Sequence, residues 1–192
     1  SGVSGLNDEF PNVTLYSASR RGLAGSSFVE INDGDTIQLG SLKIEAVRTP
    51  AHTQDSTCFY LPGHLFVSDA LFSAGCGRLF EGTAADLERA MDRFAGFPPE
   101  TLIYFGHEYT ISNLRFALTV EPDNQDIRDY MSHCQEKLKA DRYTTPTTVA
   151  QELKVNPFLR IDQEDVIKFV DPGESYNRKE RIGLLRKAKD NF

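Results

Sequence analysis

The stretch that decides the fold runs over residues 48–83, RTPAHTQDSTCFYLPGHLFVSDALFSAGCGRLFEGT. It places His52 in a tight turn, Asp69 at the end of an apolar run, and Arg78 in a glycine-rich loop. Further along the chain, His107 follows another apolar run. Polar side chains that follow strands are the usual components of functional sites in α/β proteins, so these residues are the first candidates.

Local patterns outward from this stretch predict strands followed by a helix. Alternating apolar and polar residues predict one hairpin over 36–47 and another over 57–67. Thr83 has Asp86 three residues after it, which is capping-box spacing, and apolar residues then recur at helical intervals. A β-branched and aromatic run over 101–105 predicts a buried strand.

Beyond Thr110 the sequence predicts helices and no strand. Apolar spacing predicts helices over 114–118, 127–138, 147–153, 166–170 and 182–186. Strands followed by a run of helices predict an α/β (α+β) layer with a small all-α part after it. We therefore expect two domains, 1–110 and 111–192, with no flexible linker between them.

Composition narrows the class of protein. The chain has 192 residues, of which 40% are hydrophobic and 26% charged, as in ordinary globular domains. Its net charge of −7 argues against generic nucleic-acid binding, which needs a basic surface. Because no long apolar run and no basic-then-apolar leader occur, we expect neither a membrane span nor a secretory signal. A cytoplasmic location follows, with the mitochondrion as the alternative.

The cysteines favour a reducing compartment. Cys58, Cys76 and Cys134 are odd in number and have no CxxC spacing. Reduced thiols that pack as small apolar side chains are therefore expected, rather than a disulfide framework.

His52, Asp69 and His107 could form half of a metal site. Imidazole and carboxylate are ligands that suit Zn²⁺ or Fe, and an aspartate can bridge two metal ions. Taken singly, each residue also has an ordinary structural interpretation, since histidines and aspartates near strand ends are often caps or exposed turn residues. From the residues alone, both interpretations stay open.

Longer sequence motifs identify a resemblance. The segments TPAHTQDSTCFYLPGHLFVSDALFSAGCGRLFEGT, YFGHEYTISNLRFALTVEPDN, NPFLR and LRKAKDNF resemble those of the hydroxyacylglutathione hydrolase (glyoxalase II) family. That family belongs to the metallo-β-lactamase superfamily, and the resemblance covers almost the whole chain. It implies the C-terminal portion of an αββα sandwich followed by the family's helical substrate-binding domain.

The resemblance also implies roles for individual residues. His52 corresponds to a ligand of one metal ion, His107 to a ligand of a second, and Asp69 to the carboxylate that bridges them. The implied cofactors are two ions of Zn, Fe or Mn. The residues that correspond to substrate-binding positions of the family are Arg78, Phe80, Tyr109, Arg186 and Lys189. The implied reaction, part of methylglyoxal detoxification, is hydrolysis of the thioester S-D-lactoylglutathione to D-lactate and glutathione by metal-bound hydroxide.

The chain departs from the family at its main metal-binding motif. The family's Thr-His-x-His-x-Asp-His motif, which supplies four metal ligands, occurs nowhere in this sequence. The opening SGVSGLNDEFPNVTLY resembles the segment that follows the motif. Ala51 also stands where the family usually has glycine, before His52. With three protein ligands for two metals, we expect weak metal binding and crippled catalysis unless other ligands come from elsewhere.

Two further expectations follow from this departure. The sheet would expose an apolar face and unpaired edges, which a second copy of the chain or a complementing chain would cover. The alternative to a thioester hydrolase is a non-catalytic relative that binds glutathione thioesters or a protein partner.

Overall fold

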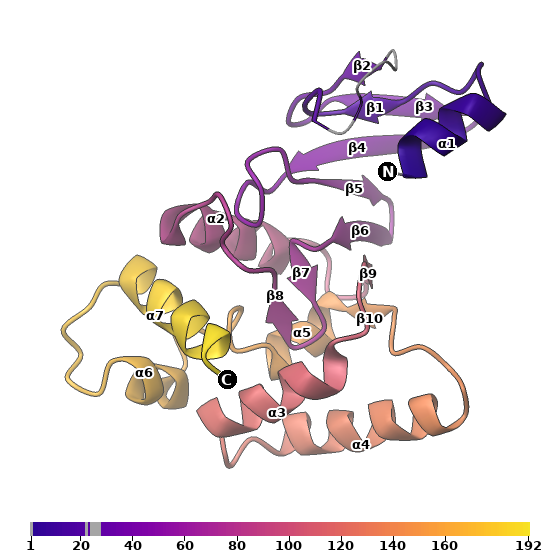
Figure 1. Cartoon of the computed structure of the whole chain (residues 1–192). Helices are drawn as coiled ribbons and strands as arrows, with labels where there is room; N and C mark the ends of the chain where they lie inside the picture. Colours follow the sequence, from indigo (N-terminus) through magenta and orange to yellow (C-terminus); the bar gives the residue numbers. More distant parts are fainter. Residues whose placement is uncertain (1, 22, 24–27) are drawn as a thin grey trace.

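The computed structural model describes residues 2–21, 23 and 28–192 (Figure 1). The main sheet has six strands: β3 (Thr36–Leu39), β4 (Leu42–Arg48), β5 (Thr57–Leu61), β6 (His64–Ser68), β9 (Leu102–Phe105) and β10 (Thr147–Thr148). Two short pairs accompany it: β1 (Tyr16–Ser17) with β2 (Val29–Glu30), and β7 (Leu71–Phe72) with β8 (Gly75–Cys76). The helices are α1 (Gly2–Glu9), α2 (Ala84–Ala95), α3 (Thr110–Val120), α4 (Gln125–Lys139), α5 (Val149–Val155), α6 (Glu164–Val170) and α7 (Arg178–Asp190). Among the described residues, no helix is long and apolar enough to cross a membrane.

The strand order of the main sheet is β10-β9-β6-β5-β4-β3. Strands β3 to β6 pair antiparallel in succession, which confirms both predicted hairpins. Strand β9 then pairs parallel to β6 after the α2 crossover. Strands β4, β6 and β9 therefore run in the same direction, so their carboxyl ends lie at one edge of the sheet.

One face of the sheet is the core, and the other is partly exposed. In β6 the side chains alternate, so Leu65 and Val67 are buried while His64 and Phe66 face outward. On the outer face, Phe66 is 45% exposed and stacks on Tyr104, with ring centroids 4.8 Å apart. The expectation of an exposed apolar face is thus confirmed for Phe66. Cover by a second copy or a complementing chain stays a prediction.

Helix α2 begins where the sequence predicts. The Thr83 side chain accepts a hydrogen bond from the Asp86 N–H at 3.3 Å, and Asp86 Oδ2 accepts one from the Thr83 N–H at 2.7 Å. This capping box satisfies N–H groups that have no partner within the helix. The helix then buries its apolar side against the core through residues that include Leu87 and Phe94.

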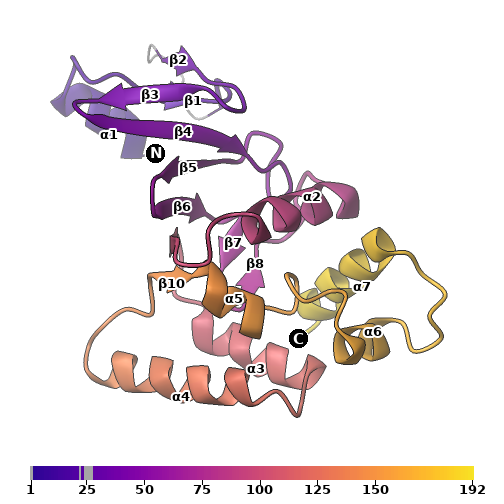
Figure 2. The same cartoon turned by 180° about the vertical axis from the view of Figure 1, so that it is seen from behind.

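The second half of the chain gathers its helices at the β9–β10 end of the sheet, whereas α1, β1 and β2 lie beside β3 and β4 at the other end (Figures 1 and 2). The C-terminal helix α7 returns to pack against α2. Gly183 makes this close approach feasible, because a Cβ there would already lie 3.1 Å from the Ala84 Cβ. Arg178 ties the same two helices through an ion pair with Asp92 at 2.8 Å.

The structure corrects several local predictions. A strand does occur after Thr110: β10 pairs antiparallel with β9, so the helix predicted over 147–153 begins only at Val149. Strand β10 has only two residues, which are too few to show a period-2 pattern, so the sequence analysis did not predict this strand. The hairpin of β7 and β8 also went unpredicted, since side chains from distant helices stabilise it. The three cysteines are free and buried, as expected.

The N-cap of α2 gives a stability prediction. Replacing Thr83 by alanine removes the side-chain acceptor, so the free energy of unfolding should fall by about 1 kcal/mol. Urea denaturation followed by circular dichroism measures this loss. Thr83→Ser keeps the hydroxyl and is the matched control. An alanine variant as stable as the serine variant would contradict the capping role.

Candidate functional site

Three side chains converge at the carboxyl edge of the sheet. Asp69 follows β6, His107 follows β9, and His52 lies in the turn after β4. The Asp69 Oδ2 atom lies 3.4 Å from His107 Nε2 and 3.9 Å from His52 Nε2. Because the three strands run in the same direction, residues far apart in the sequence meet here. This edge is where α/β sheets place ligands.

The second ring nitrogen of His52 fixes its orientation. His52 Nδ1 lies 2.9 Å from the Arg78 carbonyl oxygen, which can only accept a hydrogen bond. Nδ1 therefore carries a proton, and Nε2 is the ring nitrogen on the side of Asp69. Histidines that ligate metals are oriented in this way by a backbone carbonyl or a carboxylate.

Two glycines allow the cluster to close. A Cβ on Gly77 would lie 2.1 Å from the Asp69 carbonyl oxygen and 2.8 Å from His52 Nδ1. A Cβ on Gly106 would lie 2.8 Å from Asp69 Oδ1. Any larger residue at either position would displace Asp69 or His52.

The cluster fits part of a metal site. A tetrahedral zinc ion, with bonds of about 2.0–2.1 Å, separates its ligand atoms by about 3.3–3.4 Å. The separation between His107 and Asp69 matches this value, and that between His52 and Asp69 is wider. Across residues 2–21, 23 and 28–192, no group of three or more His, Cys, Asp or Glu side chains is arranged to hold a metal ion by itself. A closed site would need further ligands.

A cavity of about 580 Å³ extends from this cluster toward α7. All the residues that the sequence analysis singled out line it: His52, Asp69, Arg78, Phe80, His107, Tyr109, Arg186 and Lys189. The cavity thus joins the loops of the sheet to the C-terminal helix. It is large enough for a ligand the size of a small peptide.

Aromatic rings form the walls next to the histidines. Phe80 is 67% exposed and lies against His52, with ring centroids 4.9 Å apart. Tyr109 stacks on His107 at 5.1 Å. Both rings offer exposed apolar surface beside the polar cluster.

The two outer cations of the cavity are available to a ligand. The Arg78 side chain is 64% exposed and makes only a long ion pair with Asp190, at 3.5 Å. The Lys189 ammonium lies over the rings of Phe116 and Phe192, 5.1 and 5.0 Å from their centroids. Burial, and then the nearby charge of Arg186, lower the pKa of Lys189 to about 8.

Arg186 is more deeply embedded. It is 5% exposed, donates from Nη1 to the Cys76 carbonyl oxygen at 2.8 Å, and donates from Nη2 to Asp190 at 3.1 Å. Its guanidinium also lies over the Phe158 ring. Arg186 therefore braces the end of β8. Direct contact of Arg186 with substrate stays a prediction.

Asp190 and Asn113 are among the polar residues of the cavity wall that sequence reasoning missed. Asp190 pairs with both Arg78 and Arg186, and its i+4 spacing from Arg186 on α7 was an available signal. Asn113 is 5% exposed and donates to the Ser73 carbonyl oxygen at 3.0 Å. A polar residue on the apolar side of α3 was its only local signal.

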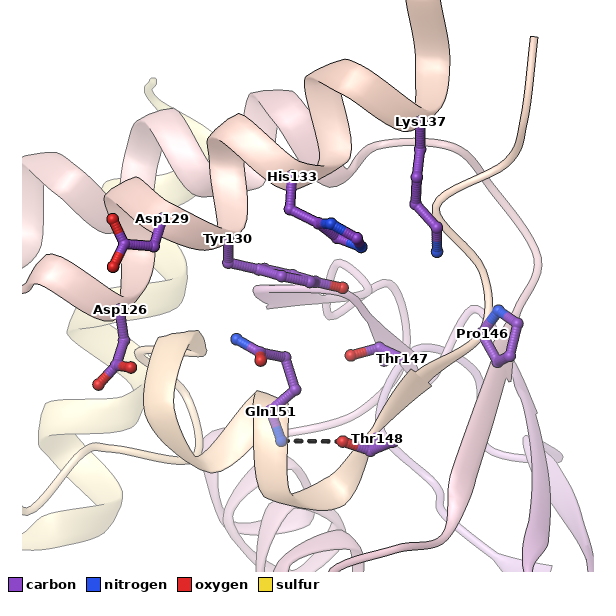
Figure 3. Close-up of a pocket in the computed structure, with 9 residues that line it drawn as sticks. All are labelled: Asp126, Asp129, Tyr130, His133, Lys137, Pro146, Thr147, Thr148 and Gln151. Carbon is purple, nitrogen blue, oxygen red and sulfur yellow. Dashed lines mark hydrogen bonds between the residues drawn. The ribbon is translucent and has the colours of Figure 1, made fainter. Parts of the chain in front are cut away.

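A second groove, of about 370 Å³, lies between α4 and the segment that contains β10 and the start of α5 (Figure 3). His133 and Tyr130 stack along its wall, with ring centroids 6.4 Å apart. Asp126 lies in the first turn of α4 and Lys137 in its last, the order that the helix dipole favours. These two charges therefore have a structural reason in the helix itself.

Family comparisons divide the chain into two matched parts. Residues 4–107 match the model of the metallo-beta-lactamase superfamily. Residues 108–192 match the model described as the hydroxyacylglutathione hydrolase C-terminus.

Solved structures share the fold. ETHE1 from Myxococcus xanthus superposes with a TM-score of 0.59 at 23% identity, over 99% of this chain and 72% of that one. TTHA1623, solved in a di-iron-bound form, gives a TM-score of 0.53 at 19% identity, over 82% of this chain and 70% of that one. At these identities the likeness supports the fold alone.

Relatives in sequence are closer. The hydroxyacylglutathione hydrolase of Maricaulis maris is 42% identical over 85% of this chain and 64% of its own length. That of Klebsiella pneumoniae is 35% identical over 100% of this chain and 76% of its own length. The chain thus spans roughly two thirds to three quarters of these relatives. With both halves matched in order, the chain belongs to the hydroxyacylglutathione hydrolase (glyoxalase II) family of the metallo-β-lactamase superfamily.

Proposed function

We propose that this chain provides the glutathione-thioester pocket and part of the metal centre of a hydroxyacylglutathione hydrolase. The reaction is hydrolysis of S-D-lactoylglutathione to D-lactate and glutathione. One observation carries the proposal: a single cavity joins the cluster of His52, Asp69 and His107 to the cations Arg78 and Lys189.

The cations suit an anionic thiol tripeptide. Glutathione carries carboxylates, and local cations are needed to hold them on a chain with a net charge of −7. Arg78 can bind one carboxylate in bidentate fashion, whereas Lys189 offers a point charge. With the peptide held there, its thioester would lie toward the histidines. Phe80 and Tyr109 would shield the thioester from bulk water.

His52, Asp69 and His107 would hold the metal side of the site. A bound metal ion would lower the pKa of water and so supply a nucleophile at neutral pH. Neighbouring residues orient the cluster: the Arg78 carbonyl oxygen hydrogen-bonds the His52 ring, and Gly77 and Gly106 leave room for Asp69. The superfamily implies metal ions. The number of ions and the choice among Zn, Fe and Mn belong to this proposal.

A second candidate function is binding of glutathione thioesters without hydrolysis. The observation in its favour is that, among the described residues, no group of three or more His, Cys, Asp or Glu side chains is arranged to hold a metal ion by itself. The two candidates share the pocket and differ only in metal-dependent turnover, so metal binding distinguishes them.

Metal binding is the first test. We expect Zn²⁺, Fe²⁺ or Mn²⁺ to bind this chain far more weakly than a four-ligand site would, because three side chains leave coordination positions to water. Asp69→Ala should abolish the binding in calorimetric titrations, since Asp69 faces both histidines. His64→Ala is the control, as His64 lies outside the cavity. Two tightly bound ions per chain with rapid thioester turnover would contradict this expectation.

The cations are tested with S-methylglutathione, which cannot be hydrolysed. Arg78→Ala and Lys189→Ala should each weaken its binding by about five- to tenfold, the effect of losing one charge-assisted contact. Lys187 has the same charge and lies on the same helix, but it is exposed and outside the cavity. Lys187→Ala should therefore bind S-methylglutathione as tightly as the wild type. Equal affinity of all three variants would rule out the pocket assignment.

Lys189 also predicts a pH dependence. Its pKa is lowered to about 8, so its positive charge is present below that pH and is lost as pH rises through it. Binding of S-methylglutathione should therefore weaken from about pH 7 to about pH 9, where an ordinary lysine with a pKa of about 10.4 would stay charged. Lys189→Arg keeps its charge throughout and should give a flatter profile. If binding to the wild type and to Lys189→Arg showed the same pH profile, the pH dependence of binding would not come from Lys189.

A further inference from the structure

Glu152 is a buried carboxylate that the proposed chemistry does not use. It lies on α5, is 0% exposed, and does not line the cavity of the cluster. Its carboxylate accepts four hydrogen bonds, from Ser73 Oγ (2.8 Å), Ala74 N (2.7 Å), Thr147 Oγ1 (2.9 Å) and Asn156 Nδ2 (2.9 Å). A buried carboxyl group is costly unless its oxygens are satisfied by hydrogen bonds in this way, so its presence on an otherwise apolar side of a short helix requires a reason.

The bonds of Glu152 hold the turn between β7 and β8. Ala74 in this turn has a φ of 56°, a conformation that residues other than glycine rarely adopt. Its N–H donates to Glu152. The turn therefore depends on a partner from α5, and removing that partner would leave a buried N–H unsatisfied.

Side-chain amides satisfy the carbonyl groups of the same turn. Asn156 Nδ2 donates to the Phe72 and Gly75 carbonyl oxygens at 3.3 and 3.1 Å, and also to Glu152. Asn113 Nδ2 donates to the Ser73 carbonyl oxygen at 3.0 Å. The hairpin is thus clamped by the helical part of the chain, with Glu152 at the centre of the clamp.

The hairpin leads directly into the site. Immediately after the turn, the Cys76 carbonyl oxygen accepts from Arg186, and Gly77 packs against Asp69. The next residue, Arg78, uses its carbonyl oxygen to orient His52. A shift of the turn would therefore move the group that sets the tautomer of His52 and one cation of the pocket together.

We propose that Glu152 is a positioning residue for the site: by clamping the Ser73–Ala74 turn, it aligns the segment 76–78 so that Arg78 orients His52 and faces the ligand. As far as it concerns the ligand, this inference rests on the proposed function. Its effect on His52 is independent of any ligand.

The test follows the His52 ring and ligand affinity separately. Long-range ¹H–¹⁵N NMR of the imidazole at about pH 8, above the usual histidine pKa of about 6.5, reports the tautomer. In the wild type we expect the Nδ1–H form. Glu152→Ala should shift His52 toward the Nε2–H form and weaken S-methylglutathione binding roughly tenfold, as for the loss of one ionic contact.

Two variants separate positioning from stability alone. Glu152→Gln should retain the tautomer, because its amide oxygen still accepts from Ala74 and Asn156 while the hydroxyls of Ser73 and Thr147 can turn to accept. Glu121→Ala is the matched control: Glu121 is also a buried carboxylate of the helical part, 2% exposed and paired with Arg160 at 2.7 Å. Glu121→Ala should lower the stability of the fold without changing the tautomer of His52.

The outcomes are distinct. If Glu152→Ala does not fold, Glu152→Met preserves the volume without the acceptors and takes its place. A folded variant of either kind that keeps the Nδ1–H tautomer would overturn the inference, and so would an equal shift in Glu121→Ala. Failure of the wild type to bind S-methylglutathione would instead count against the proposed function, and the NMR result would still decide the role of Glu152.

Discussion

The site depends on the direction of three strands. Because β5 is antiparallel to both β4 and β6, and β9 is parallel to β6, the carboxyl ends of β4, β6 and β9 share one edge. Of the residues after them, His52 and His107 consequently each lie within 4 Å of Asp69. The parallel pair needs a crossover, and α2 with its capping box provides it. Reversing any one of these strands would carry its residue of the cluster to the opposite edge.

The helical part of the chain completes the cavity from the other side. It supplies Lys189 directly, and through Arg186 and Glu152 it braces the strand and turn that lead to Arg78. The sheet thus positions the cluster of His52, Asp69 and His107, and the helices position the cationic side of the cavity. The two parts coincide with the two regions matched by family models, residues 4–107 and 108–192.

Charge is distributed accordingly. The chain is acidic overall, yet cations concentrate along the cavity. They are not equivalent: the Arg78 side chain is exposed, the Lys189 ammonium lies over two aromatic rings, and Arg186 is buried and donates hydrogen bonds to Cys76 and Asp190. These three residues carry the same charge, but the fold places each in a different environment. All three side chains line the cavity, but Arg186 is more deeply buried than Arg78 and Lys189.

The sequence by itself determined the local elements and the family. Period-2 alternation predicted both hairpins, the Thr83 capping box predicted the start of α2, and long motifs around His52, Asp69 and His107 identified the ancestry. Such features depend on residues near one another in the chain. Tertiary structure alone decided the β7–β8 hairpin, the strand β10, and the roles of Asn113, Arg186 and Glu152. Asn113, Glu152 and Arg186 each have a hydrogen-bond partner on the β7–β8 hairpin that lies 40, 79 and 110 residues away in the chain, and local patterns do not show such partners. Whether a buried polar group is satisfied becomes visible only once the chain has folded.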